Sequence, residues 1–151
     1  MAKPTYFLLV EDDPNDAFFV EREFKQAPAY LGLRIVTDGR NAVRYLRGEG
    51  QYADRAKFPV PNVILLDLKM PGMSGFDFLE WLRSEAATEQ RVIPVVVMSS
   101  SPLQEDIKRA YALGVNSYMT KPIEWTRFRD RIRMLGIYWS EHAETPEASA
   151  K

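Results

Sequence analysis

Short apolar runs alternate with amphipathic segments along this 151-residue chain. Four runs lie at residues 6–10, 33–38, 63–67 and 92–100, and residues 116–122 hold a short fifth strand candidate. Two of them, 63–67 and 92–100, are apolar on both faces, which is typical of parallel strands covered by helices. The alternation predicts a single α/β domain of five strand–helix repeats. We expect a flavodoxin-like, doubly wound parallel sheet with strand order 2-1-3-4-5.

The segments between these runs predict five helices. The first should be capped by Asp13 and start at Pro14, because proline suits the first helical position. The others are expected at residues 41–47, 75–85, 102–114 and 123–135. Residues 48–62 contain two prolines and no clear period, so we predict a long loop there.

The composition excludes several classes of protein. The chain has 20 basic and 21 acidic side chains without a basic stripe, so nucleic-acid binding is not expected. It has no cysteine, and therefore no disulfide framework. No stretch approaches the roughly 20 apolar residues that span a bilayer, and the apolar run among the first residues is too short for a secretory signal. We therefore expect a cytoplasmic protein that does not bind membranes.

Polar residues follow the apolar runs where each predicted strand ends. Glu11 and Asp12 follow the first strand, Asp67 ends the third, Ser99 ends the fourth and Lys121 follows the fifth. In such a sheet the first and third strands are neighbours at the point where strand order reverses, so their acids should meet in one crevice. Uncompensated carboxylates there would repel, and Mg²⁺ with its preference for oxygen ligands would relieve the conflict.

The same residues suit phosphoryl transfer. A carboxylate can act as the nucleophile, and Asp67 is the best candidate because it stands alone between the acid pair and the serine and lysine. A lysine supplies positive charge for a phosphoryl oxygen, and a metal ion neutralises charge that develops during transfer.

Four separate motifs, in order, resemble the receiver domain of two-component response regulators. They are LLVEDDP (8–14), LLDLKMPGMSG (65–75), PVVVMSS (94–100) and YMTKPI (118–123). The likeness covers residues from about 5 to 136, and four motifs in the right order make it specific. Glu11 is a departure, since many members of the family have aspartate at that position.

The resemblance implies a role for each matched position. Asp67 would be the phosphoacceptor, in a reaction that needs Mg²⁺, for which Mn²⁺ or Ca²⁺ can substitute. The metal ligands would be Asp12, Asp67, the main-chain carbonyl of Lys69 and, through water, Glu11. The phosphate-binding and switch residues would be Ser99, Lys121 and Tyr118, with a cis bond between Lys121 and Pro122. Ser100 and Ser101 are expected to be solvated or to form local caps.

The long loop and an aromatic extension also resemble the small, stand-alone receivers that partner bacterial phytochrome histidine kinases. We expect a receiver domain at residues 1–136 and a short extension with a flexible tail at 137–151, without an output domain. The chain would then accept phosphate from a histidine kinase and signal through its fourth helix, fifth strand and fifth helix. Trp125, Tyr138 and Trp139 suggest a partner surface and a homodimer, unless the extension covers its own fifth helix.

Two other functions stay open at this point. The first is a small Mg²⁺-dependent phosphohydrolase that works through an aspartyl phosphate. Such enzymes usually carry a second acid two residues after the nucleophile, where this chain has Lys69. The second is a pseudo-receiver, a binding module that is never phosphorylated, which the intact set of acids, serine and lysine argues against.

Overall fold

The computed structural model describes residues 3–147, in which five parallel strands form one sheet in the order β2-β1-β3-β4-β5. The strands are β1 (Thr5–Val10), β2 (Leu31–Val36), β3 (Val63–Leu66), β4 (Val95–Ser99) and β5 (Ser117–Thr120). The helices are α1 (Pro14–Lys25), α2 (Gly39–Arg47), α3 (Gly75–Ser84), α4 (Gln104–Ala112) and α5 (Trp125–Ile137). The predicted flavodoxin-like topology is thereby confirmed.

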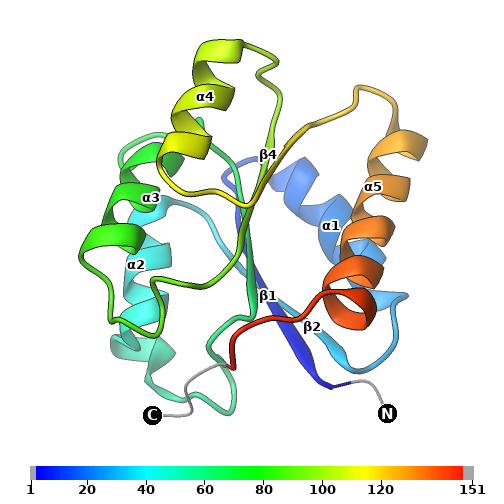
Figure 1. The fold of residues 1–151 in the computed structure, drawn as a ribbon. Coiled ribbons are helices and arrows are strands. Elements are labelled where there is room, and N and C mark those ends of the chain that lie inside the picture. Colours follow the sequence, from blue (N-terminus) through cyan, green and yellow to red (C-terminus); the bar gives the residue numbers. More distant parts are fainter. Residues whose placement is uncertain (1–2, 148–151) are drawn as a thin grey trace.

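Helices cover both faces of the sheet. Figure 1 shows α1 and α5 on one side, and α2, α3 and α4 on the other. Along β3, Ile64 and Leu66 belong to the core beneath α2 and α3, whereas Val63 and Leu65 belong to the core beneath α1 and α5. All four side chains are buried, which confirms that this strand is apolar because both of its faces are covered.

The helix starts follow capping chemistry. The Asp13 carboxylate accepts the Asn15 amide at 2.8 Å, so α1 begins at Pro14 as predicted. Helix α2 begins two residues earlier than predicted, because Asp38 is its cap and accepts the Asn41 amide at 2.7 Å.

Residues 48–62 form a packed segment rather than an unstructured loop. A short 3-10 helix (Gly50–Ala53) buries Tyr52, whose ring centroid lies 5.0 Å from that of Tyr45 and 5.2 Å from that of Phe58. The Arg55 guanidinium donates to the Tyr45 carbonyl at 2.8 Å. The loop is therefore held against the end of α2 by aromatic contacts and an arginine.

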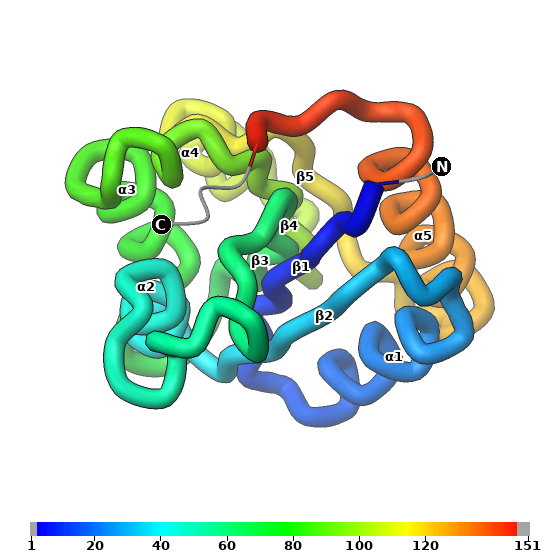
Figure 2. The backbone as a smooth tube through the Cα atoms, turned by 90° about the horizontal axis from the view of Figure 1, so that it is seen from below, coloured from blue at the N-terminus to red at the C-terminus, as the bar shows by residue number. Residues whose placement is uncertain are grey.

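The chain after α5 returns to the amino-terminal ends of the strands. A π-helical turn (Tyr138–His142) follows α5 directly, so the predicted domain boundary at 136 falls inside continuous helix. Lys3, Thr5 and Asn62 line one cavity with residues 139–147. Figure 2, which views this end, shows the red segment crossing it. Residues 148–151 of the predicted extension lie outside the described residues.

Candidate functional site

The register of the sheet brings Glu11 and Asp67 side by side. Val10 pairs with Leu66, and the Asp67 amide donates to the Val10 carbonyl at 3.0 Å, so the pairing with β1 continues to the first residue after β3. Glu11 is fixed on its other side, where its amide donates to the Val36 carbonyl at 3.0 Å. The two acids that end neighbouring strands therefore share one crevice, as predicted.

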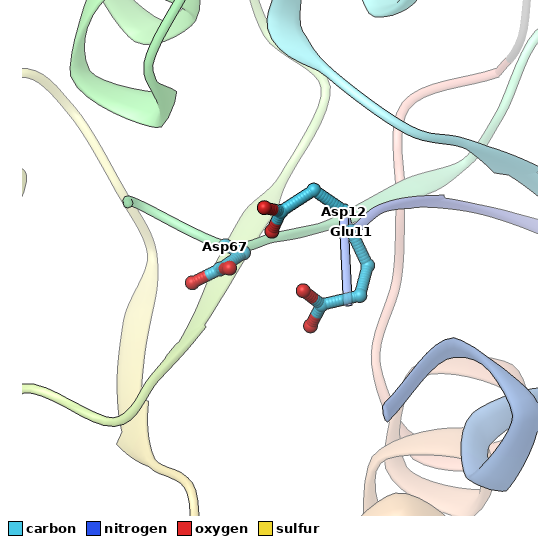
Figure 3. Close-up of side chains that lie close together, drawn as sticks. All are labelled: Glu11, Asp12 and Asp67. Carbon is cyan, nitrogen blue, oxygen red and sulfur yellow. The ribbon is translucent and has the colours of Figure 1, made fainter. Parts of the chain in front are cut away.

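Three carboxylates converge in this crevice. One oxygen from each of Glu11, Asp12 and Asp67 lies within 4.8 Å of the others, and Figure 3 shows the three side chains close together. Glu11 and Asp67 are only 3% and 8% exposed, and Asp12 is more accessible. Burial raises the pKa of Glu11 to about 8, and it raises the pKa of Asp67 as well. A divalent cation would offset the cost of these charges, and an all-oxygen set fits Mg²⁺ or Mn²⁺.

The Lys121 ammonium group lies beside the acids. It donates to Glu11 Oε1 at 2.5 Å and to Asp16 Oδ2 at 2.8 Å, and it lies 3.9 Å from Asp67 Oδ2. Burial lowers the pKa of Lys121, but hydrogen bonds to Asp16 and Glu11 outweigh burial and raise the pKa above its usual value. Sequence reasoning missed Asp16, although an acid in the first turn after the Asp13 cap was a signal that it lies near the strand ends.

The bond between Lys121 and Pro122 was expected to be cis, and this expectation is wrong. No cis peptide bond occurs in the part of the chain that the structure describes. Before proline the trans form is favoured by about 0.5–1 kcal/mol unless surrounding contacts impose cis. Here the Lys121 amide donates to the Ser99 carbonyl at 2.7 Å, and its ammonium group reaches the site with the bond in the trans form.

Ser99 and Tyr118 are connected through Ser101. The Ser101 amide donates to Ser99 Oγ at 3.1 Å, and the Tyr118 hydroxyl donates to the Ser101 carbonyl at 2.8 Å. The Ser101 hydroxyl donates to Asp106 at 2.5 Å and accepts the Leu103 amide at 3.3 Å. Ser101 is 6% exposed, so it is a buried local cap rather than a solvated residue. Its role in linking the two predicted switch residues was not predicted.

The Met-Pro-Gly turn after β3 places Lys69 between the crevice and α4. The Lys69 ammonium group lies 3.5 Å from the Asp106 carboxylate on α4, and the Lys69 carbonyl remains the predicted metal ligand. The turn closes where the Gly75 amide donates to the Leu68 carbonyl at 2.9 Å. A Cβ atom on Gly75 would lie 2.7 Å from the Leu68 Cα atom, so only glycine allows α3 to begin this close to the site.

The three aromatic residues of the predicted partner surface differ in exposure. Trp125 is half-buried, and its ring centroid lies 4.2 Å from that of Phe19 on α1. Trp139 is also half-buried against the core beneath α5, whereas Tyr138 is 51% exposed. Both indoles thus pack in part against their own chain, and Tyr138 is the accessible member.

A family model for the response regulator receiver domain matches residues 7–133. The chain belongs to this family. The probable methanogenesis regulatory protein FilR2 of Methanothrix harundinacea is 34% identical over 140 residues, which cover 90% of this chain and 84% of FilR2. Response regulator Rcp1 of Synechocystis is 32% identical over 145 residues, which cover 96% of this chain and 95% of Rcp1.

Solved receiver structures extend this likeness. The phosphorylated cyanobacterial phytochrome response regulator RcpA has a TM-score of 0.87 at 31% identity, and the match covers 95% of this chain and 99% of RcpA. The Mn²⁺-bound form of Rcp1 has a TM-score of 0.85 at 31% identity, over 95% of this chain and 100% of Rcp1. The chain is thus a response regulator receiver domain, a signalling module that accepts phosphate, and it matches RcpA and Rcp1 along nearly their whole length.

Receiver domains bind Mg²⁺ or Mn²⁺ in this acidic pocket, and the Glu11, Asp12 and Asp67 cluster fits such an ion. Among the described residues, no helix combines the length and the apolar character needed to cross a bilayer.

Proposed function

We propose that Asp67 accepts a phosphoryl group from a sensor histidine kinase with a phytochrome input domain. The observation that carries this proposal is the position of Asp67, the one carboxylate at the end of β3, beside two acids and a buried ammonium group. The likeness to phytochrome response regulators supports the choice of kinase. We further propose that the protein acts in the cytoplasm, where a kinase finds its ATP, and that it catalyses no reaction beyond its own phosphorylation and dephosphorylation.

In the proposed reaction, an Asp67 carboxylate oxygen attacks the phosphorus of a phosphohistidine. The new bond joins that oxygen to phosphorus, and the nitrogen–phosphorus bond breaks, so the imidazole keeps the electron pair. Asp12, Asp67, the Lys69 carbonyl and, through water, Glu11 would hold Mg²⁺, which neutralises charge on the phosphoryl oxygens. Lys121, whose ammonium group lies 3.9 Å from Asp67 Oδ2, would supply a second positive charge.

We propose that Ser99, Lys121 and Tyr118 then carry the signal to the surface. Ser99 and Lys121 would bind phosphoryl oxygens, and the backbone of Ser101 would pass a movement of Ser99 to the Tyr118 hydroxyl. The outcome is a changed surface of α4, β5 and α5. This receiver surface is the proposed output, and the match to the response regulator Rcp1, which covers 95% of Rcp1, supports the proposal.

We also propose a homodimer through this surface, extended by residues 136–142. Three apolar side chains near the end of α5 support it: Met134, Ile137 and Tyr138 are 55%, 48% and 51% exposed. Light scattering over a concentration series, with and without a phosphoryl mimic, tests the dimer. Tyr138→Ala should weaken it, whereas Phe18→Ala, an equally exposed aromatic on α1, should not. A monomeric mass in both states would exclude the proposal.

A phosphotransfer assay with candidate phytochrome kinases tests the main function. The natural protein should gain an acid-stable, base-labile phosphoryl group in the presence of Mg²⁺, and chelation of the metal should prevent this. Asp130→Asn is the matched control, because Asp130 is an exposed carboxylate on α5 whose side chain is 68% exposed. Equal labelling of the Asp67→Asn and Asp130→Asn variants would refute the assignment of Asp67.

A further inference from the structure

The Lys121 ammonium group has three acids around it and is shared unequally among them. It donates to Glu11 and Asp16, at 2.5 and 2.8 Å, while Asp67 lies at 3.9 Å, beyond hydrogen-bond range. The lysine side chain is only 10% exposed, so water replaces these partners poorly. The ammonium group is therefore drawn toward α1 and away from the predicted phosphoacceptor.

Asp16 differs from the other acids because it lies outside the metal cluster, which consists of Glu11, Asp12 and Asp67. It belongs to the first turn of α1, where the Asp13 cap accepts the Asp16 amide at 3.4 Å. A cation that engages Glu11 would weaken the hold of Glu11 on Lys121 but would leave Asp16 free to keep its bond. Asp16 is thus the partner that Lys121 retains when the metal site is filled.

We propose that Asp16 is a positioning residue that holds the Lys121 ammonium group toward α1 and competes for it with a phosphoryl group on Asp67. The proposal rests on the proposed function of Asp67 and Lys121. The lysine must give up or share its bond to Asp16 when it binds the phosphoryl oxygens. Asp16 thereby limits the strength of the phosphoryl–lysine contact, and with it the energy available to move the surface.

The charge balance around Lys121 supports this competition. The hydrogen bonds that Lys121 donates to Asp16 and to Glu11 both raise the pKa of Lys121. The lysine stays protonated throughout the range in which proteins function, so the competition is between anions for one cation. A neutral amide in place of Asp16 would still accept a hydrogen bond but would bind the ammonium group less strongly.

The binding of beryllofluoride with Mg²⁺, a phosphoryl mimic, tests the proposal. Asp16→Asn should tighten beryllofluoride binding by about 2- to 10-fold, because a neutral acceptor holds the ammonium group less strongly than a carboxylate does. Glu21→Gln is the matched control, because Glu21 lies on the same helix, pairs with Lys25 and does not contact Lys121. Equal affinities of Asp16→Asn and Glu21→Gln would overturn the proposal.

A double-mutant cycle separates an effect through the lysine from a general loss of negative charge. In the Lys121→Ala background, Asp16→Asn should leave beryllofluoride affinity unchanged, because the competing cation is gone. The same tightening in that background would mean that Asp16 acts through its charge alone, and would overturn the proposal.

A crystal structure of metal-free Asp16→Asn provides a readout that involves no phosphoryl chemistry. The distance from Lys121 Nζ to Asp67 Oδ2 should shorten from 3.9 Å to hydrogen-bond length. An unchanged distance would contradict the positioning role. If beryllofluoride binds neither the natural protein nor Asp16→Asn, the proposed function of Asp67 fails instead.

Discussion

Lowering the pH from about 8 to about 6 should weaken Mg²⁺ binding by about 50-fold, because Glu11 must lose its proton before the cation binds. Burial raises the pKa of Glu11 to about 8. Roughly half of the molecules are therefore protonated at about pH 8, and about one in a hundred is ionised at about pH 6. The raised pKa of Asp67 would add to the effect. Titration calorimetry at several pH values measures the affinity and the protons released.

Glu11→Gln is the control for this effect. The variant should bind Mg²⁺ more weakly at pH 8 but should show a flatter pH dependence, because the group that titrates has been removed. An affinity of the natural protein that changes less than about threefold over the same range would refute the reasoning.

The metal-free protein should respond to pH in the opposite direction. Because the folded chain holds the Glu11 proton more tightly than the unfolded chain, the free energy of unfolding should fall as pH rises from about 4.5 to about 8. Mg²⁺ should restore stability near pH 8, where the carboxylates are ionised. Urea unfolding with and without Mg²⁺ measures both effects.

Three substitutions address the site directly. Asp67→Asn should abolish phosphorylation by small phosphodonors while the fold survives, and a phosphoryl adduct of undiminished mass-spectrometric intensity would contradict this. Gly75→Ala should lower the free energy of unfolding by roughly 2–4 kcal/mol, because its Cβ atom would meet the backbone of Leu68, and equal urea midpoints would show that the backbone can adjust. The Lys121→Ala variant should still accept phosphate, but its phosphorylation should not increase its affinity for the partner. A pull-down with the phosphorylated variant measures this affinity.

The sheet could be predicted because its signal is local. A strand such as β3 is apolar on both faces only if helices cover both, and an acid directly after it marks the carboxyl end. Parallel register then placed Glu11 beside Asp67 without any further assumption. The start of α2 was misplaced because the sequence allows Asp38 either to end the preceding strand or to cap the helix. In the structure Asp38 is the cap, because its carboxylate accepts the Asn41 amide.

The partners of Lys121 and the burial of Ser101 could not be predicted from the sequence. Lys121 and Asp16 are 105 residues apart, and their contact depends on where α1 leaves the sheet. Ser101 looks like a polar loop residue, and its burial depends on Asp106 and Tyr118, which approach it from two different elements. Such contacts arise from tertiary packing, which no local pattern records.

The amide and carbonyl groups of Ser101 connect the proposed phosphate site to the proposed output surface. Its amide donates to Ser99 Oγ and its carbonyl accepts from the Tyr118 hydroxyl, so a single residue contacts both side chains. Thermodynamic reciprocity then requires that any partner whose binding favours one position of Tyr118 changes the affinity of the site for a phosphoryl ligand by the same factor. A downstream target that binds this surface would thus change how long the receiver stays phosphorylated, and so would lengthen or shorten the signal that recruits the target.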